Sequence, residues 1–364
     1  MKRAFKIMSL FTGTGGMDLG FEMYNHPNFE FKVVWANDNF FPATQTFERN
    51  FGLKMDPTDV WDVDFKKTPE CDGILAGFPC QDFSVLNKQR GVNVKRGQLY
   101  TRVVDALAVK KPLFFVAENV KGIVSANNGN ALKIINEEFE NPGGGVEYNI
   151  KIKVLNFADY GVPQTRQRTI FVGLRKDLGL EYEFPVGEHA KNHISVQTAF
   201  EKPTENLPYN NNVLEAEFNN DRHDVKPRTT EIISAIPPGG NYKHLEGKFD
   251  KSGKSLYVKG LMSSIYRRLD PNKPAYTVIA KGGGGTLGYH YREPRPLTNR
   301  ERARLQSFPD NFIFVGKMGE VRELIGNAVP PLGAKAIAES VIKLFDENQK
   351  HTTKNSQQTI EKFL

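Results

Sequence analysis

The chain has 364 residues, 39% of them hydrophobic and 25% charged, with a formal net charge of +7 at pH 7. This balance is that of an ordinary globular protein with a substantial core, and its basic character permits a polyanionic partner without requiring one. There is no apolar run long enough to cross a bilayer and no signal-peptide pattern, and Cys71 and Cys80 are the only cysteines. We therefore expect a cytoplasmic protein without a disulfide framework or a thiolate zinc cluster.

The first half of the chain alternates between strand and helix patterns. Strands are expected at residues 7–11, 32–36, 73–76, 113–117, 150–155 and 169–174, and helices at residues 17–23, 42–51 and 99–109. The strands are almost continuously apolar, which favours an α/β fold with a mostly parallel sheet covered by helices on both faces. In such sheets, ligands bind at the carboxyl ends of the strands.

The pattern changes after about residue 175. Residues 176–290 are rich in Asn, Pro, Gly and Lys and have few periodic runs. Regular secondary structure is expected again at residues 297–308 and in a helix at 330–345, which would pack beside the glycine-rich loop that follows the first strand. The polar stretch 348–364 is expected to fray. We therefore expect a catalytic domain formed by residues 1–175 and 320–364, and a smaller loop-rich domain with its connecting segment at 176–319.

A glycine-rich loop, residues 11–17, follows the first strand. Glycines between a strand and a helix let a ligand approach the backbone at the helix N-terminus. A dinucleotide fingerprint would need glycine at position 18, where the chain has Asp18, so no pyrophosphate is expected here. Asp38 ends the second strand, and its carboxylate suits the hydroxyls of a ribose. The loop and Asp38 together indicate a nucleoside cofactor without a diphosphate, for which S-adenosylmethionine is the candidate.

Cys80 follows the strand at residues 73–76, after the strand-breaking Gly77 and Pro79. It is therefore expected on a loop at the carboxyl edge of the sheet. A thiol there acts as a nucleophile if its surroundings favour the thiolate, whereas the alternative is a small buried side chain without chemistry.

Glu118 ends the strand at 113–117, at the same edge as Cys80. In a water-poor pocket its pKa would rise and make it a hydrogen-bond donor to a ring nitrogen, and the alternative is simply the first exposed residue after a strand. Arg166 and Arg168 alternate before the strand at 169–174, so both point to one side. Two neighbouring guanidiniums suit phosphate or base oxygens, although a solvated edge strand would look the same.

Taken together, these segments resemble the bacterial cytosine-5 DNA methyltransferases of restriction–modification systems, in the order of that family and over nearly the whole chain. The motifs that carry the resemblance lie at residues 11–16, 77–84, 118–120, 164–168, 300–309 and 326–330. The resemblance implies a Rossmann-like S-adenosylmethionine-dependent methyltransferase sheet with a smaller target-recognition domain.

The resemblance also implies the chemistry. The enzyme would methylate carbon 5 of a cytosine within a short specific sequence of double-stranded DNA, after flipping the base out of the helix. Cys80 would add covalently to carbon 6, and Glu118 would hydrogen-bond ring nitrogen 3 and the exocyclic amine. Arg168 would hold the 2-oxo group, with Arg166 supporting the loop or the DNA backbone. Either water or a side chain would remove the carbon 5 proton.

A cofactor pocket for S-adenosylmethionine follows from the same resemblance. Asn39 stands where relatives often carry an aromatic residue, and Phe40 is a possible replacement for stacking on the adenine. The residues expected to form this pocket are Phe11, Gly13, Thr14, Gly15, Gly16, Met17, Asp38, Asp59, Val60, Pro79, Leu99, Asn327 and Val329.

The loop at residues 85–98 is basic and is expected to close over the DNA backbone. The residues expected to contact DNA are Ser84, Lys88, Arg90, Lys95, Arg96, Gln164 and Thr277, with Arg267, Arg268, Lys281 and Arg292 as further candidates in the recognition domain. The resemblance implies a monomer that pairs in function, without a stable complex, with a restriction endonuclease.

Three other functions are weighed against this one. A tRNA cytosine-5 methyltransferase would lack the long segment between Arg168 and Leu297, and a silent DNA-binding homologue would not need Cys80 and Glu118. A nicotinamide oxidoreductase is disfavoured by Asp18. The histidines are scattered along the chain, so no metal is expected.

Overall fold

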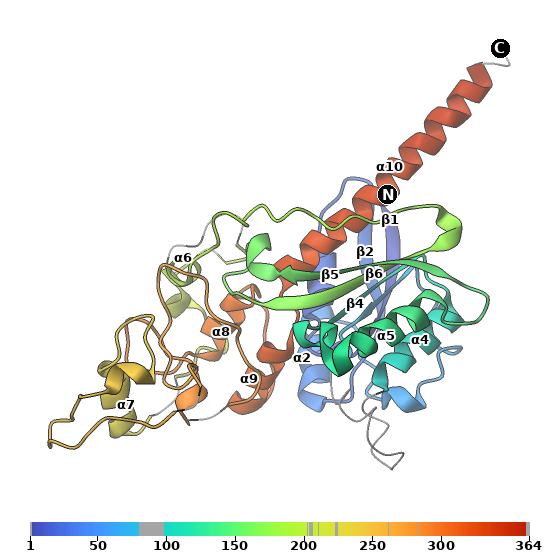
Figure 1. Ribbon diagram of the computed structural model, residues 1–364. Coiled ribbons are helices and arrows are strands. Elements are labelled where there is room, and N and C mark those ends of the chain that lie inside the picture. Colours follow the sequence, from blue (N-terminus) through green and yellow to red (C-terminus); the bar gives the residue numbers. More distant parts are fainter. Residues whose placement is uncertain are drawn as a thin grey trace.

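The computed structural model describes residues 2–79, 98–201, 203, 207–209, 211–222, 225–260, 262–282 and 284–361, with side chains as far as residue 347. Its centre is a six-stranded sheet with the order β2-β1-β3-β4-β6-β5 (Figure 1). The strands are β1 (Arg3–Leu10), β2 (Phe29–Asn37), β3 (Gly73–Ala76), β4 (Phe114–Val120), β5 (Tyr148–Asn156) and β6 (Gln167–Arg175). The pairs β1–β2, β1–β3 and β3–β4 are parallel, whereas β6 runs antiparallel to both β4 and β5. The predicted, mostly parallel α/β sheet is confirmed, with β6 as its reversed strand.

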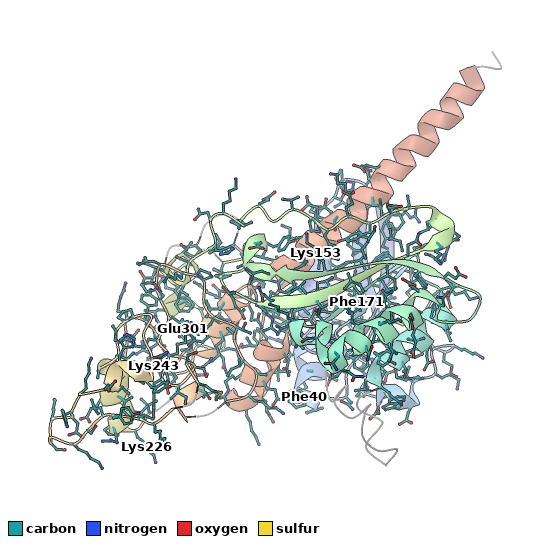
Figure 2. The ribbon with its side chains drawn as sticks, viewed as in Figure 1. Phe40, Lys153, Phe171, Lys226, Lys243 and Glu301 are labelled. Carbon is teal, nitrogen blue, oxygen red and sulfur yellow. The ribbon has the colours of Figure 1, made fainter. Side chains whose placement is uncertain are left out.

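Helices cover both faces of the sheet because its strands bury side chains on both sides. In β1, Phe5 and Ile7 belong to one hydrophobic cluster, and Met8 and Leu10 belong to the other. The helices on the first cluster are α1 (Gly16–Glu22), α2 (Phe41–Phe51) and α10 (Pro331–Glu361), and those on the second are α4 (Leu99–Lys110) and α5 (Asn130–Glu140). Figure 2 shows Phe171 of β6, which belongs to the second cluster. Burial on both faces explains why the strands read as continuous apolar runs.

Between β6 and α10 the chain forms the smaller lobe of Figure 1, with short helices and long irregular stretches. Its helices are α6 (Val196–Glu201), α7 (Pro227–Ser234), α8 (Asn299–Leu305) and α9 (Met318–Asn327). A small hydrophobic cluster of its own consists of Ile232, Ile236, Tyr242, Leu245 and Leu256. Phe200 and Tyr291, in contrast, belong to the main cluster with α1 and α10. The hydrophobic core therefore does not divide at residue 176, the predicted domain boundary.

Two helices differ from the sequence prediction. The pattern of the sequence does not predict α5, and α10 continues to Glu361 through the stretch 348–364 that is predicted to fray. After Gly333, α10 contains neither glycine nor proline up to Glu361, so no residue of the kind that usually ends a helix interrupts it. None of the helices in the described part of the chain is long and apolar enough to cross a membrane.

Single 3-10 turns complete the connections. They are η1 (Val60–Asp62), η3 (Lys121–Val124), η4 (Ala126–Gly129), η5 (Phe157–Tyr160), η6 (Lys176–Leu178), η7 (Val213–Glu215), η8 (Tyr242–Leu245) and η9 (Gly284–Thr286). Of these, η1 follows α2, and η3 directly follows β4.

Candidate active site

A cavity of about 680 Å³ lies at the carboxyl ends of β1, β2, β3 and β4. Its described wall also includes the glycine loop, residues 59–61, and the C-terminal end of α9 with residues 326–329. All the predicted cofactor residues except Gly15 line this cavity. The predicted catalytic residues Glu118 and Arg168 line it too. The structure therefore brings the predicted cofactor residues and this catalytic pair to the same cavity.

Glycine is required in the loop between β1 and α1 for two physical reasons. Gly13 and Gly15 adopt φ values of +56° and +79°, in the left-handed region that other residues rarely enter. A Cβ atom on Gly16 would lie 2.3 Å from the carbonyl oxygen of Val329, and one on Gly15 would meet the ring of Phe51 at 2.6 Å. Gly15 is therefore structural, and Gly16 allows the segment after α9 to form a wall of the cavity.

Asp38 is fixed by two backbone amides. Its Oδ2 accepts a hydrogen bond from the N–H of Gly13 at 2.8 Å, and its Oδ1 accepts one from the N–H of Phe40 at 2.9 Å. Burial raises the pKa of this carboxyl, and the two amides oppose that rise. A carboxylate has about four lone-pair sites, so Asp38 retains acceptor capacity for hydroxyl groups.

Two aromatic residues line the cavity together with Asp38: Phe40, which the sequence suggested as a replacement, and Trp61. Asn39 is a hydrogen-bond donor whose Nδ2 lies 3.5 Å from Oδ2 of Asp59. The rings of Phe40 and Trp61 both line the cavity. Trp61 was not singled out from the sequence, although an aromatic residue directly after the predicted Asp59 and Val60 was an available signal.

Glu118 and Arg168 form an ion pair at the end of β4. Nε of Arg168 lies 2.8 Å from Oε1 of Glu118, and the two side chains are only 14% and 11% exposed, respectively. Burial raises the pKa of Glu118, and the charges of Arg168 and Arg166 oppose that rise. The antiparallel pairing of β4 with β6 places Arg168 opposite Val120, within reach of Glu118. The arrangement supplies a buried acid beside a fixed cation.

The residue after Glu118 holds the segment that leads to Cys80. Nδ2 of Asn119 donates a hydrogen bond to the carbonyl of Phe78 at 3.0 Å. Cys80 itself lies outside the described residues, as do the predicted DNA contacts Ser84, Lys88, Arg90, Lys95 and Arg96. The described residues on either side, Pro79 and Leu99, both line the cavity.

Arg166 is buried, with 1% of its surface exposed. Its Nη2 donates to the carbonyls of Gly326 and Ala328, each at 3.0 Å, and its Nη1 donates to that of Val278 at 3.3 Å. Burial, together with the charge of Arg168, lowers the pKa of Arg166 to about 9. Arg166 therefore supports the loops around the cavity, the first of the two roles predicted for it.

Two predicted DNA contacts are also buried. Gln164 is fully buried, its Nε2 donates to the carbonyl of Leu305 at 2.9 Å, and its Oε1 accepts from the N–H of Val278 at 2.7 Å. Arg268 donates to the carbonyls of Ile236 and His290 from a buried position. Both side chains would have to leave these partners to touch DNA, so here they hold the fold instead.

Thr277, by contrast, is only half-buried, and its Oγ1 donates to the carbonyl of Thr165 at 2.8 Å. It therefore lies beside the loop that precedes β6. Among the other candidates, Arg267 lies 4.3 Å from the ring centroid of Tyr276, Lys281 pairs with Glu323, and Arg292 pairs with Glu201.

Comparison with known proteins identifies the family to which the chain belongs. Residues 5–343 match the model of the C-5 cytosine-specific DNA methylases. The chain is 42% identical over 348 residues to the Type II methyltransferase M.NgoFVII of Neisseria gonorrhoeae, covering 94% of this chain and 88% of that protein. It is 41% identical over 356 residues to the Type II methyltransferase M.BbvI of Brevibacillus brevis, covering 94% and 91%. The chain belongs to the C-5 cytosine-specific DNA methylase family.

The methylase also shares its fold with solved structures. An Escherichia coli prophage protein assigned as a DNA modification methyltransferase superimposes with a TM-score of 0.70 at 23% identity, covering 94% of this chain and 99% of that one. The predicted family and enzyme class, a DNA (cytosine-5-)-methyltransferase of the Type II restriction–modification group, are confirmed.

The raised pKa of Glu118 predicts a pH-dependent stability. Because its folded pKa lies above the ordinary 4.5, the folded methylase retains a proton that the unfolded chain releases between these two values. The contribution of Glu118 to the free energy of unfolding is therefore fully present below pH 4.5 and falls as the pH rises through the folded pKa. Urea denaturation across this range should show wild type losing stability relative to Glu118→Gln as the pH increases. Glu137→Gln, at an exposed side chain of α5, is the matched control.

Proposed function

We propose that the methylase methylates carbon 5 of a cytosine in a short specific sequence of double-stranded DNA, using S-adenosylmethionine. Cys80 attacks carbon 6 of a base that has been flipped out of the duplex. The observation that carries the proposal is the shared cavity, in whose wall the predicted cofactor residues stand beside the Glu118–Arg168 pair.

The described residues fit the proposed cofactor. Asp38, fixed by two amides, accepts from the ribose hydroxyls, and Asp59 with Val60 borders the adenine. Phe40 and Trp61 supply rings beside this end of the cavity, and the glycine loop lets the ligand approach the backbone. When bound, S-adenosylmethionine supplies an electrophilic methyl group.

Glu118 and Arg168 hold the cytosine ring. Burial favours the protonated form of Glu118, which donates to ring nitrogen 3, and this hydrogen bond withdraws charge from carbon 6. Arg168 uses Nε toward Glu118 and Nη1 toward the carbonyl of Gln167, at 2.9 Å. Its Nη2 takes part in neither contact and is assigned to the 2-oxo group of the base.

Cys80 completes the reaction. Its thiolate forms a bond to carbon 6, and the electron pair released toward carbon 5 takes the methyl group. Loss of the carbon 5 proton, to water or to a side chain, returns an electron pair to the ring and expels the thiolate. Asn119, the neighbour of Glu118, donates to the carbonyl of Phe78, two residues before Cys80, which supports a nucleophile that acts beside Glu118.

We further propose a biological pairing. The relatives M.NgoFVII and M.BbvI are Type II methyltransferases, which supports a role in protecting DNA from a restriction endonuclease. The methylase and this endonuclease recognise the same DNA sequence but form no stable complex. The methylase acts as a monomer.

Replacing the nucleophile tests the reaction directly. We expect wild type, incubated with a plasmid and S-adenosylmethionine, to protect cytosines at one short recurring sequence in bisulfite sequencing. Cys80→Ala should abolish this protection because no covalent adduct forms. Cys71→Ala, at the other cysteine, should leave it intact. Protection retained by Cys80→Ala would overturn the covalent mechanism, and protection of an RNA target alone would overturn the substrate.

Replacing the acid tests the ring contact. Glu118→Gln removes the ionisable proton donor with little change in size, and we expect the single-turnover rate of methyl transfer to fall ~10²-fold or more. Glu323→Gln is the matched control, since Glu323 also lines the cavity but pairs with Lys281 at 3.3 Å. Equal rates for the two variants would count against the proposed role of Glu118.

Charge removal tests the loop after Cys80. The double variant Lys95→Ala/Arg96→Ala should make the plot of log affinity against log salt shallower, by ~0.9 for each phosphate that the loop no longer neutralises. The control Lys151→Ala/Lys153→Ala removes the same charge from β5, where Figure 2 shows Lys153. An unchanged slope in the first variant would contradict closure of this loop over DNA.

A further inference from the structure

The predicted adenine-side residues Asp59 and Val60 lie in an irregular connection. Residues 52–72 link α2 to β3, are all described, and contain no helix or strand apart from η1. Asp59, Val60 and Trp61, at the start of η1, line the cavity. Oδ1 of Asp59 accepts a hydrogen bond from the N–H of Trp61 at 3.1 Å, which caps the turn locally. An irregular segment has few backbone partners of its own, so its position depends on side chains of neighbouring elements.

Arg102 of α4 holds this turn through two backbone carbonyls. Its Nε donates to the carbonyl of Val60 at 2.9 Å, and its Nη2 donates to that of Val63 at 2.7 Å. Its Nη1 lies 2.6 Å from Oδ2 of Asp105, one turn further along α4. The ion pair with Asp105 fixes the guanidinium on α4, and the two carbonyls fix η1 to the guanidinium.

The same guanidinium lies beside two aromatic rings. Its central carbon is 4.7 Å from the ring centroid of Phe65 and 5.9 Å from that of Trp61, within the range of cation–π attraction. The side chain of Arg102 is only 14% exposed and stands outside the cavity wall, whereas Trp61 is part of that wall. Arg102 therefore fixes the backbone at Val60 and lies against the ring of Trp61 without facing the cavity itself.

Lys110, two turns further along α4, holds the same connection away from the cavity. Its Nζ donates to the carbonyl of Thr68 at 2.6 Å and pairs with Glu70 at 3.0 Å, and its side chain is 1% exposed. Neither Thr68 nor Glu70 belongs to the described cavity wall. The helix thus secures the connection at two points, and of these two cations only Arg102 secures the part that lines the cavity.

We propose that Arg102 is a positioning residue for the cofactor, which acts through the turn at Val60 and Trp61. This inference rests on the proposed cofactor, whose adenine is assigned to this wall. A guanidinium donates in one plane with a fixed geometry, so it sets two carbonyls relative to α4 more strictly than a flexible ammonium would. Leu99, at the start of α4, lines the cavity directly. The helix therefore serves the adenine side of the cavity both by contact and through Arg102.

Steady-state methylation of plasmid DNA tests this role through two separate constants. Arg102→Met keeps an unbranched side chain but has no N–H donors. We expect its KM for S-adenosylmethionine to rise ~10-fold, because the wall loses two charge-assisted hydrogen bonds that hold it. Its kcat at saturating cofactor should change by less than about twofold, because Glu118 and Arg168 belong to β4 and β6. Arg102→Lys, which keeps the charge without the planar fork, should give an intermediate KM.

Lys110→Met is the matched control, because it removes the same charge and a buried donor from the same helix. Its KM for S-adenosylmethionine should equal that of wild type. A merely structural role for Arg102 would reduce the amount of folded enzyme, and therefore kcat, while KM stayed unchanged in both Arg102 variants. That result, or an equal rise in KM for Arg102→Met and Lys110→Met, would overturn the positioning role.

Fluorescence of Trp61 gives a second readout, which requires no cofactor. Trp35 and Trp61 are the only tryptophans of the chain, so Trp35→Phe isolates the emission of Trp61. In this background Arg102→Met should shift the emission to longer wavelength, since the ring loses the guanidinium beside it, and Lys110→Met should not. An unshifted emission would overturn the proposed action through Trp61. If wild type used no S-adenosylmethionine, the proposed cofactor would fail and this role with it, whereas failure of the role alone leaves the wild-type reaction intact.

Discussion

The backbone of residues 326–329 is held against the glycine loop, and the cavity depends on this contact. On one side, only glycine at position 16 admits the carbonyl oxygen of Val329, which lies 2.3 Å from where a Cβ would be. On the other side, the buried guanidinium of Arg166 donates to the carbonyls of Gly326 and Ala328. Leaving a buried donor or acceptor without its partner costs about 1–3 kcal/mol, so each group keeps the other in place. Segments from the beginning, middle and end of the chain meet here.

The three carboxyl groups of the cavity, those of Asp38, Glu118 and Asp18, differ in the groups that surround them. Backbone amides bind Asp38, a guanidinium pairs with Glu118, and no cation among the described residues pairs with Asp18, which is held by Ser9. In the proposed function, the first environment suits a carboxylate that accepts from ribose hydroxyls, and the second suits an acid that donates to a ring nitrogen. One cavity thus offers different chemistry at each end although all three groups are carboxyls.

The net charge of the chain overstates the cationic surface available to DNA. Several arginines are buried and donate to carbonyls or buried acids, among them Arg166, Arg268, Arg300, Arg302 and Arg304. In α8, Arg300 and Arg304 tie distant loops of the smaller lobe to the main core. The motif at residues 300–309 therefore serves the fold, since its buried arginines donate to backbone carbonyls of segments distant in the sequence.

Local patterns in the chain were enough to predict the strand and helix alternation, the glycine loop, and the acids at the ends of β2 and β4, because apolar periodicity and glycine spacing are properties of neighbouring residues. The family motifs also indicated a set of proposed cofactor residues, all of which except Gly15 line the cavity. The burial of Gln164, Arg166 and Arg268 was settled by tertiary packing alone, because a guanidinium or amide donates equally well to a phosphate and to a carbonyl. The hydrogen bonds of Arg102 to the carbonyls of Val60 and Val63 were likewise invisible in the sequence, since they depend on how α4 packs against the connection that precedes β3.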